Sequence, residues 1–376
     1  MDVVHTRADC TDALDRARAA GRTVGLVPTM GALHAGHTSL IARARAECDV
    51  VAVTIFVNPL QFGDPGDIAA YPRTLAHDLA VCAEAGADVV FAPTVTEMYP
   101  SWPARPATTV SVRGLSDAWE GASRPGHFDG VATVVATLFS IAGRCRAYFG
   151  LKDFQQLAVV RRLTEDLALP VEVVGCPIVR EPDGLALSSR NVRLAPAERA
   201  AATVLSRALA AGRAALAAGV HSPAAVCEVM RAVVGTEPLV DLDYATVVDA
   251  RTLAEPPLVE DLAAVRLLIA ARVGPVRLID NSAAVEELAS DRAAEPLVDL
   301  DYAAVVDART LVEPEVVADL AGVRLLVAAR VGPVRLIDNS AATAEDLTAE
   351  GPTDAPPTLR SVPPVADAAR QLERIG

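Results

Sequence analysis

The sequence predicts an α/β protein with a parallel sheet in its first half and a smaller α+β domain after it. Three observations support this. Strand-like and helix-like segments alternate as far as residue 174, a polar loop at 181–193 precedes two Ala-rich helical patterns, and residues 237–284 recur almost unchanged at 295–342. Strands that alternate with helices of this length indicate βαβ units. We therefore expect a Rossmann-like domain, and then a C-terminal α+β domain that contains a tandem-duplicated β segment.

Each element of the first half is predicted from its apolar pattern and its flanking residues. Ligands of parallel sheets bind at the carboxyl ends of the strands. Segments 30–37, 58–62 and 150–153 each follow a predicted strand, so they are the first places to look for a site. The expected strands are 23–28, 50–57, 88–91, 146–149 and 171–174, and the expected helices are 37–47, 74–85, 131–142 and 154–167.

The second half begins with two expected helices, 196–218 and 223–234. Ser222 suits the N-cap of the second helix and Pro223 its first turn. The repeat follows, with an offset of 58 residues and differences at seven of its 48 positions. Each copy predicts a strand, an acidic connector and a hairpin.

We expect the first copy to form the C-terminal domain, because the two preceding helices can cover its apolar face. The second copy should pack peripherally, extend a sheet edge or remain loosely ordered. The predicted domains are a nucleotide-binding domain at 1–182, a lid domain at 183–284, the duplicated copy at 285–342 and a flexible, acidic, Pro-rich tail at 343–376.

Charge and composition exclude several classes of protein. The formal net charge is −14, from 34 basic and 48 acidic residues. This argues against a broad nucleic-acid surface or an anionic membrane as partner. The longest uncharged apolar run, 130–143, is too short to span a bilayer, which needs about 20 residues. Six scattered cysteines and an N-terminus without an apolar core lead us to expect a cytoplasmic protein with reduced thiols and no signal peptide.

The basic residues are arginines with one exception, Lys152. Its surroundings, Phe-Gly-Leu-Lys-Asp, exclude a Walker A loop. An incidental surface lysine is one interpretation. The other is a site that needs a compact, flexible point charge in place of a planar guanidinium.

The strongest local signal is PTMGALHAGH at 28–37, directly after a predicted strand. The glycines permit a tight turn and a close approach to a ligand. His34 and His37 share one face at the start of the next helix, where free N–H groups and the helix dipole favour an anion. Two core histidines that cap a turn are the alternative, but HxGH after a strand favours a phosphate site.

Three further segments follow strands or join the two halves. Segment 149–156 combines Lys152 with an acid and two amides, which fits a nucleotide site. Segment 187–191, Leu-Ser-Ser-Arg-Asn, offers hydroxyls and a guanidinium to a polyphosphate. Asn58 is either a substrate-binding amide or a residue that forms a turn with Pro59.

Together these motifs resemble the pantoate–β-alanine ligase family of the HxGH nucleotidyltransferase superfamily. The resemblance extends over about residues 1–284 and includes PTMGALHAGH, FVNPLQF, YPRT, RPGHFDGVATVV, YFGLKDFQQ and GLALSSRN. It implies that ATP activates pantoate as an acyl adenylate and that β-alanine then displaces AMP. It also implies Mg²⁺ on the polyphosphate, a lid formed by the C-terminal domain and a homodimer of N-terminal domains.

The resemblance assigns site residues position by position. His37 is the family's proton donor, and Gln61 and Gln156 would hold pantoate, with Asn58 beside them and Gln61 also close to β-alanine. The expected catalytic residues are His34, His37, Lys152, Ser188, Ser189 and Arg190. The expected ATP site comprises Met30, Gly31, Ala32, Leu33, His34, Ala35, Gly36, His37, Gly150, Leu151, Lys152, Asp153, Val179, Leu187, Ser188, Ser189 and Arg190.

The chain departs from the family pattern at a few positions. Leu187 replaces a usual methionine, and Leu151 replaces a common glutamate. An acidic pair near the metal often follows YPRT, but here only Asp78 remains, which makes it the candidate Mg²⁺ ligand.

Two other functions remain open at this point. One is a different adenylylating nucleotidyltransferase, which would not need the amides of Gln61 and Gln156. The other is a catalytically silent binding protein, against which the intact set of polar motifs argues. Release of pyrophosphate from ATP that requires pantoate would separate the three. An aminoacyl-tRNA synthetase does not fit, because the chain is acidic and has no basic RNA-binding domain.

Overall fold

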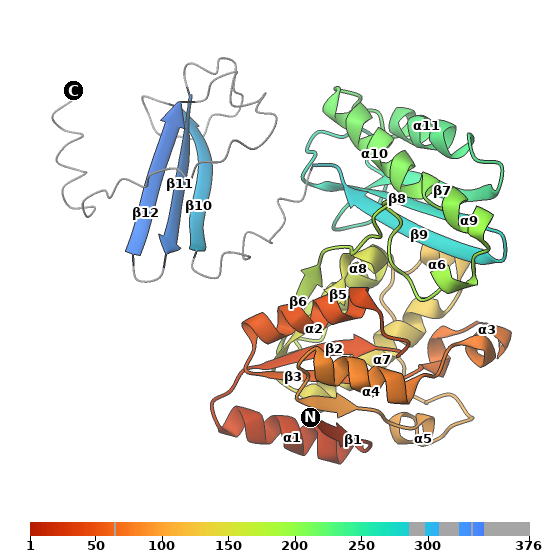
Figure 1. Cartoon of the computed structure of the whole chain (residues 1–376), viewed down its shortest axis with the longest axis vertical. Coiled ribbons are helices and arrows are strands. Elements are labelled where there is room, and N and C mark those ends of the chain that lie inside the picture. The colour runs from red at the N-terminus through yellow and green to blue at the C-terminus, as the bar shows by residue number, and fades with distance from the viewer. Residues whose placement is uncertain (64, 286–297, 308–322, 332–333, 342–376) are drawn as a thin grey trace. The chain divides into compact units, whose positions relative to one another are not determined.

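The computed structural model describes residues 1–63, 65–285, 298–307, 323–331 and 334–341 (Figure 1). The chain divides into two compact units, Met1–Glu286 and Glu287–Gly376. The predicted tail at 343–376 lies outside the described residues.

The first unit is built on a six-stranded sheet with the order β1-β4-β3-β2-β5-β6, in which every neighbouring pair is parallel. The parallel sheet is therefore confirmed, and the five predicted strands differ from the observed ones by one or two residues at their ends. The first strand was not predicted, because three residues are too few to show a period. The strands are β1 (Asp2–Val4), β2 (Val24–Thr29), β3 (Val50–Ile55), β4 (Val89–Phe91), β5 (Cys145–Gly150) and β6 (Val171–Cys176).

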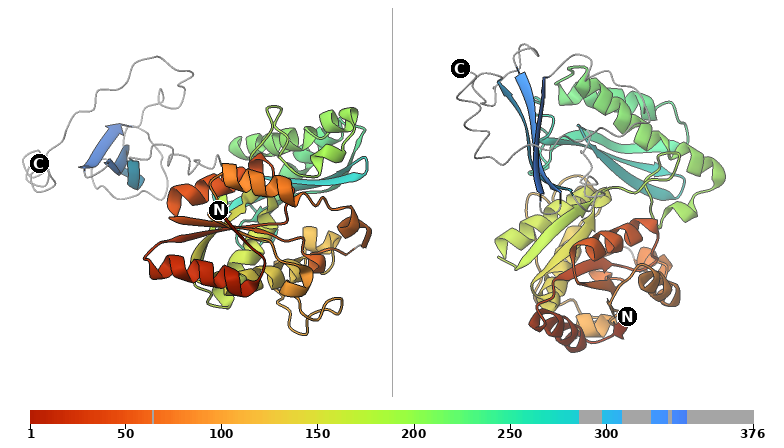
Figure 2. Two further views of the ribbon diagram at one scale, coloured as in Figure 1. Left: turned by 60° about the horizontal axis from the view of Figure 1, so that its bottom comes forward. Right: turned by 60° about the vertical axis from the view of Figure 1, so that its left-hand side comes forward.

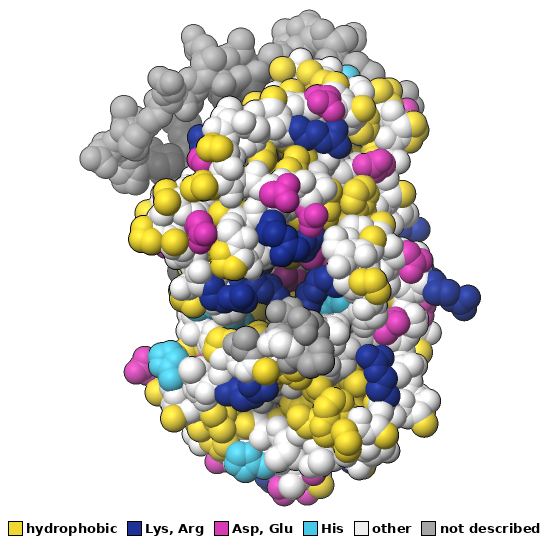
Figure 3. Space-filling view, turned by 90° about the vertical axis from the view of Figure 1, so that its right-hand side faces the viewer, with side chains coloured by type: hydrophobic (Ala, Val, Ile, Leu, Met, Phe, Trp, Pro, Cys, Tyr) yellow, Lys and Arg dark blue, Asp and Glu magenta, His cyan; other side chains and the backbone are white. Residues whose placement is uncertain are grey.

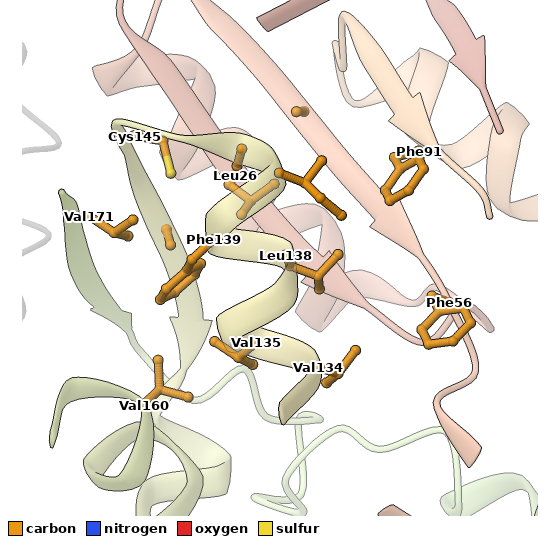
Figure 4. Packing of buried hydrophobic residues seen from close by; sticks show 14 of the residues in the cluster. Leu26, Phe56, Phe91, Val134, Val135, Leu138, Phe139, Cys145, Val160 and Val171 are labelled. Carbon is orange, nitrogen blue, oxygen red and sulfur yellow. The ribbon is translucent and has the colours of Figure 1, made fainter. Parts of the chain in front are cut away.

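Helices cover both faces of this sheet (Figures 1 and 2). Helices α1 (Arg7–Ala19), α7 (His127–Ala142) and α8 (Phe154–Asp166) bury their apolar sides in one cluster, and α2 (Ala35–Glu47) and α4 (Leu75–Glu84) in another. Figure 4 shows Leu138 and Phe139 of α7 packed toward the strands. Burial of such side chains stabilises the fold by roughly 1.5–3 kcal/mol each. The short helices are α3 (Pro65–Ala70), α5 (Val95–Met98) and α6 (Glu120–Ser123).

Helix α7 begins at His127, four residues earlier than predicted. It packs directly on the 3₁₀ turn η1 (Pro59–Gln61). A Cβ at Gly130 would lie 2.4 Å from the carbonyl carbon of Leu60, so only glycine allows this approach. The contact fixes the end of β3 against the start of α7.

The C-terminal part of the first unit is a second layer of helices on an antiparallel sheet. Strands β7 (Val240–Asp249), β8 (Val265–Val273) and β9 (Val276–Ala283) form the sheet, in that order. Helices α10 (Val204–Ala217) and α11 (Pro223–Val234) pack on it and share a hydrophobic cluster with it. This cluster is separate from those of the parallel sheet. As predicted, the Ser222 side chain caps α11.

The prediction of one helix over 196–218 is wrong. The segment forms α9 (Pro196–Ala201) and α10, separated by a turn at Ala202 and Thr203. The hydroxyl of Thr203 donates a 2.8 Å hydrogen bond to the Ala200 carbonyl. Such a bond competes with the helical ladder, and the apolar pattern alone does not reveal it.

The second unit repeats the sheet of the first copy. Strands β10 (Val298–Asp307), β11 (Val323–Val331) and β12 (Val334–Ala341) pair antiparallel, each 58 residues after its counterpart. The irregularity between Leu242 and Tyr244 recurs between Leu300 and Tyr302. Among the described strands these three form a sheet of their own, in the order β10-β11-β12.

The strand order places a switch point between β2 and β5, where the chain changes its direction across the sheet. The two strands pair only at Gly25 and Leu26 and then diverge. Pro28 lies beyond this pairing, so its missing N–H interrupts no bond toward β5. A crevice at such a switch point is the usual ligand site of an open α/β sheet.

Candidate active site

Two adjoining cavities, of about 240 and 420 Å³, occupy the crevice and its continuation toward the antiparallel sheet β7–β9. The smaller is lined by the ends of β2 and β5, and the larger by η2, the start of α8 and strands β7, β8 and β9. Figure 3 shows basic side chains gathered across the middle of this face of the molecule. Residues shared by both cavities are Phe62, Tyr71, Arg124, His127, Lys152, Asp153, Gln156, Ser189 and Arg190.

His34 and His37 cap the start of α2 and also line the smaller cavity. Nδ1 of His34 accepts a hydrogen bond from the Gly36 N–H at 3.1 Å, and Nδ1 of His37 accepts one from the His34 N–H at 3.3 Å. The ring centroids are 4.2 Å apart. Since Nδ1 accepts in both rings, we assign the proton of each neutral imidazole to Nε2. No described residue bonds to either Nε2, so each ring keeps a donor for a ligand.

Both imidazoles are held in the neutral form. Burial lowers the pKa of His37 to about 4, with a further contribution from the charge of His34. Burial and the nearby Lys152 ammonium lower the pKa of His34. Near neutral pH the pair therefore donates hydrogen bonds without adding positive charge. The two interpretations of the sequence, cap and phosphate site, use different nitrogen atoms of the same rings.

The loop between β2 and α2 is anchored by Asp78 of α4. This carboxylate, whose residue is 1% exposed, accepts the N–H groups of Ala32 at 3.0 Å and Leu33 at 2.8 Å. Both Gly31, with φ 82°, and Ala32, with φ 52°, have a positive φ. A Cβ at Gly31 would lie only 2.9 Å from Oδ2 of Asp78, so this position has room for a hydrogen atom but not for a side chain. Glycine adopts a positive φ freely, but for Ala32 this conformation is strained, and the bond to Asp78 holds it in place.

Lys152 lies on the 3₁₀ turn η2 (Leu151–Asp153) after β5. Its side chain is 17% exposed, and Nζ is 3.8 Å from Oδ1 of Asp153. Burial raises the pKa of Asp153, but the charges of Lys152 and Arg190 outweigh it, and the pKa stays below its usual value. The carboxylate is therefore ionised and partly neutralises the basic side chains around it.

Asn58 and Gln61 lie at the end of β3, on and beside η1. Asn58 is 1% exposed and its Nδ2 donates to Oε1 of Gln61 at 2.9 Å and to the Gly130 carbonyl at 3.0 Å. Its Oδ1 accepts the hydroxyl of Tyr99 at 2.9 Å. Asn58 thus forms the turn and also orients Gln61. Gln156, on α8, reaches the same cavity.

The structure brings most of the predicted site residues together. Those that do not line either cavity are Gly31, Ala32, Leu33, Ala35, Leu151 and the candidate metal ligand Asp78. Those that line the smaller cavity are Met30, His34, Gly36, His37, Asn58, Gln61, Gly150, Lys152, Asp153, Gln156, Val179, Leu187, Ser188, Ser189 and Arg190.

Three polar residues that line both cavities received no role from the sequence: Tyr71, Arg124 and His127. The Nδ1–H of His127 donates a hydrogen bond of 2.9 Å to the Gln61 carbonyl, and burial with the Arg124 charge lowers the pKa of His127 to about 4. Tyr71 comes from the YPRT motif and the other two from RPGHFDG. Their positions within these motifs are the sequence signal by which they could have been identified as site residues.

The antiparallel C-terminal part of the first unit contacts the parallel-sheet part through polar and aromatic side chains. Arg277 of β9 forms an ion pair of 2.6 Å with Glu120, whose carboxylate also accepts the hydroxyl of Tyr244 at 3.0 Å. Nε1 of Trp119 donates to the Leu253 carbonyl at 3.0 Å. Arg277, Tyr244 and Leu253 all lie in the first copy of the repeat, which therefore closes one side of the larger cavity.

The described residues contain no group of three His, Cys, Asp or Glu side chains that could hold a metal ion. Asp78 already accepts two backbone N–H groups, and it lines neither cavity. The side chains of the described residues therefore do not form a cage for Mg²⁺.

The described part of the chain contains no helix with the length and apolar character needed to cross a membrane.

Comparisons with known proteins show the family of this chain. The family model described as pantoate-beta-alanine ligase matches residues 2–283 and again 282–341. The pantothenate synthetase of Chloroflexus aggregans is 53% identical over 281 residues, which cover 75% of this chain and 99% of the relative. That of Roseiflexus sp. is 54% identical over 282 residues, 75% of this chain and 98% of the relative.

Solved structures give the same result. The pantothenate synthetase of Thermus thermophilus has a TM-score of 0.70 and 49% identity, and covers 76% of this chain and 99% of its own. The pantoate-beta-alanine ligase of Francisella tularensis, complexed with beta-gamma ATP and beta-alanine, has a TM-score of 0.62 and 31% identity, and covers 76% and 98%. This chain belongs to the pantoate–β-alanine ligase family.

Proposed function

We propose that this protein condenses pantoate with β-alanine in an ATP-dependent reaction that yields pantothenate, AMP and pyrophosphate. One observation carries the proposal. Two neutral imidazole donors, His34 and His37, lie at the switch point of the sheet in the same cavity as Lys152 and the amides of Gln61 and Gln156. Such a cavity can hold a polyphosphate and a small polar acid together.

In the first step a carboxylate oxygen of pantoate attacks the α-phosphorus of ATP. The bond to the β-phosphate oxygen breaks, and its electron pair leaves with pyrophosphate. We propose that His34, His37 and Lys152 donate hydrogen bonds to the phosphate oxygens as negative charge moves toward the leaving group. Lys152 also supplies a positive charge. Because the imidazoles are neutral in the free site, His37 acts there as a hydrogen-bond donor.

In the second step the amine nitrogen of β-alanine attacks the acyl carbon of pantoyl adenylate. The carbon–oxygen bond to the phosphate breaks, AMP leaves, and the nitrogen loses a proton. We place pantoate at Gln61 and Gln156, with Asn58 fixing the orientation of Gln61. Ser188, Ser189 and Arg190 are proposed to bind the phosphates from the opposite side of the cavity.

Mg²⁺ is proposed to enter on the phosphates of ATP, where it would neutralise charge. The described side chains form no cage for it, so ATP itself would supply its ligands. The homodimer and the cytoplasmic location stay predictions.

The test is release of pyrophosphate from ATP by the purified full chain. We expect release that requires pantoate, and pantothenate only when β-alanine is added. Release supported by another acid, or by a phosphorylated acceptor in place of pantoate, would favour a different adenylylating enzyme.

A further inference from the structure

Two adjacent residues of the lid, Asp280 and Asn281 of β9, reach back to the nucleotide-binding segments. Asn281 is 2% exposed, and its Nδ2 donates to the carbonyls of Leu151 at 3.0 Å and Lys152 at 2.8 Å. Both amide hydrogens of Asn281 are therefore used on the turn that carries the single lysine.

The orientation of this amide is fixed from behind. Nε of Arg266 donates to Oδ1 of Asn281 at 2.6 Å, and its guanidinium lies 4.3 Å from the ring centroid of Phe154. A guanidinium only donates and a carbonyl only accepts. In a flipped amide the NH₂ group would therefore face the Arg266 donor, and the oxygen would face the two carbonyl oxygens. The amide can hold the Lys152 turn in one geometry only.

Asp280 fixes a second segment. Its carboxylate, on a residue that is 4% exposed, accepts two hydrogen bonds from Arg180, at 2.7 and 2.9 Å. Arg180 in turn donates to the carbonyls of Gly184 and Asn281. Leu187 N–H bonds to the carbonyl of Val179 at 2.9 Å, which closes the loop at its base.

This loop leads directly into Ser188–Arg190. The dipeptide Asp280–Asn281 thus contacts two polar segments that border the ATP cavity, the Lys152 turn after β5 and the Arg180 loop after β6. It also lines the larger cavity. The Lys152 turn and the Arg180 loop have these hydrogen-bond partners only when the lid is docked against them.

We propose that Asp280 and Asn281 are positioning residues that couple docking of the lid to assembly of the ATP site. They act through the Lys152 turn and the Arg180 loop. The inference rests on the proposed function, because its readout is adenylation.

The key variant is Asn281→Asp, which keeps the size of the side chain but sets a carboxylate oxygen against two carbonyl oxygens. We expect single-turnover formation of pantoyl adenylate to fall at least tenfold and the apparent Kd for ATP to rise at least fivefold. Asn281→Ser, which loses both bonds without adding charge, should shift both quantities in the same direction and serves if the first variant does not fold. Asp280→Asn should raise the Kd for ATP. Asp280→Glu, which keeps the carboxylate, should raise this Kd less.

The repeat supplies matched controls. Strand β12 carries the same eight residues as β9, so Asn339→Asp and Asp338→Asn make the same changes in the second copy. We expect these controls to stay within twofold of the unaltered protein. Transfer of the acyl group from added pantoyl adenylate to β-alanine, which needs no ATP, should change less than adenylation in Asn281→Asp.

The inference is overturned if folded Asn281→Asp or Asn281→Ser adenylates pantoate and binds ATP as the unaltered protein does. It is also overturned if Asn339→Asp causes the same loss as Asn281→Asp. Failure of the unaltered protein to form pantoyl adenylate would instead contradict the proposed function.

Discussion

The carboxylate of Asp78 accepts a hydrogen bond of 2.8 Å from the backbone N–H of Leu33, across 45 residues of sequence. This bond ties helix α4 to the loop whose next residue is the first histidine of the HxGH motif. The acid expected to bind metal instead holds the loop that presents His34.

Replacement of Asp78 by Asn should weaken this anchor, because only one of the two acceptor oxygens remains and an NH₂ group faces a backbone N–H. We expect unfolding to become easier by about 1–3 kcal/mol and adenylation to slow by about tenfold, the scale of a 1.4 kcal/mol change in the barrier. Thermal unfolding and single-turnover kinetics measure the two effects. Thr74→Val, which removes only the 3.1 Å hydroxyl bond to Asp78, is the milder control. An Asp78→Asn variant with unchanged melting and rate would contradict the anchor.

His34→Asn should separate the capping role of His34 from its role at the phosphate. Asparagine is a good N-cap, so we expect its melting temperature to stay close to that of the unaltered protein. The Nε2–H donor is lost, so adenylation should fall by about 10²–10³, as when one preorganised donor is removed. His34→Ala should lose the same rate and also about 1 kcal/mol of stability. If His34→Asn keeps full activity, the ring acts only as a cap.

Lys152→Ala should lower the adenylation rate by about 10²–10³. Lys152→Arg should recover little of it, because a planar fork does not replace a compact ammonium. Rapid-quench measurement of adenylate formation with saturating ATP tests both variants. Unchanged rates in both would reduce Lys152 to an incidental lysine.

The stability of the first unit should fall as the pH drops from about 6.5 to about 4. His37 and His127 have pKa values of about 4 in the folded protein, below the ordinary value of 6.5. Between these values the unfolded chain binds more protons, so the free energy of unfolding rises with pH by up to about 1.4 kcal/mol per unit for each histidine. Urea unfolding at pH 4.5, 5.5 and 7.5 measures the slope. Carboxylates titrate in the same range, so the same measurement on His127→Gln isolates the contribution of one histidine. If the free energy of unfolding depends on pH equally in the two proteins, the prediction is contradicted.

The second copy of the repeat should be dispensable for catalysis. The first copy lies in the same compact unit as the cavities and lines the larger of them. A chain that ends at Ala284 should therefore retain pantothenate formation within about twofold. An internal deletion of residues 237–294 is the counterpart. If that deletion is active while the shorter chain is folded and inactive, the second copy is the functional lid.

The sequence predicted the parallel sheet and the position of the site well, because both depend on local patterns. Buried strands such as Val50–Ile55 are β-branched runs, and the polar motifs follow them directly. It could not predict the roles of Asp78 and Asn281, because each depends on backbone groups far away in the chain. The break in the helix after Ala201 depends on a hydroxyl that bonds its own backbone, which an Ala-rich pattern does not show.

The central claim, that pantoate is activated at the α-phosphate of ATP, is tested most directly with pantoate labelled with ¹⁸O in its carboxylate. The bridging oxygen of pantoyl adenylate comes from this carboxylate and leaves with AMP when β-alanine attacks the acyl carbon. Mass spectrometry of the products should therefore find one ¹⁸O atom in AMP for each pantothenate formed. Formation of ADP with the label in inorganic phosphate would contradict the account and indicate an acyl phosphate in its place.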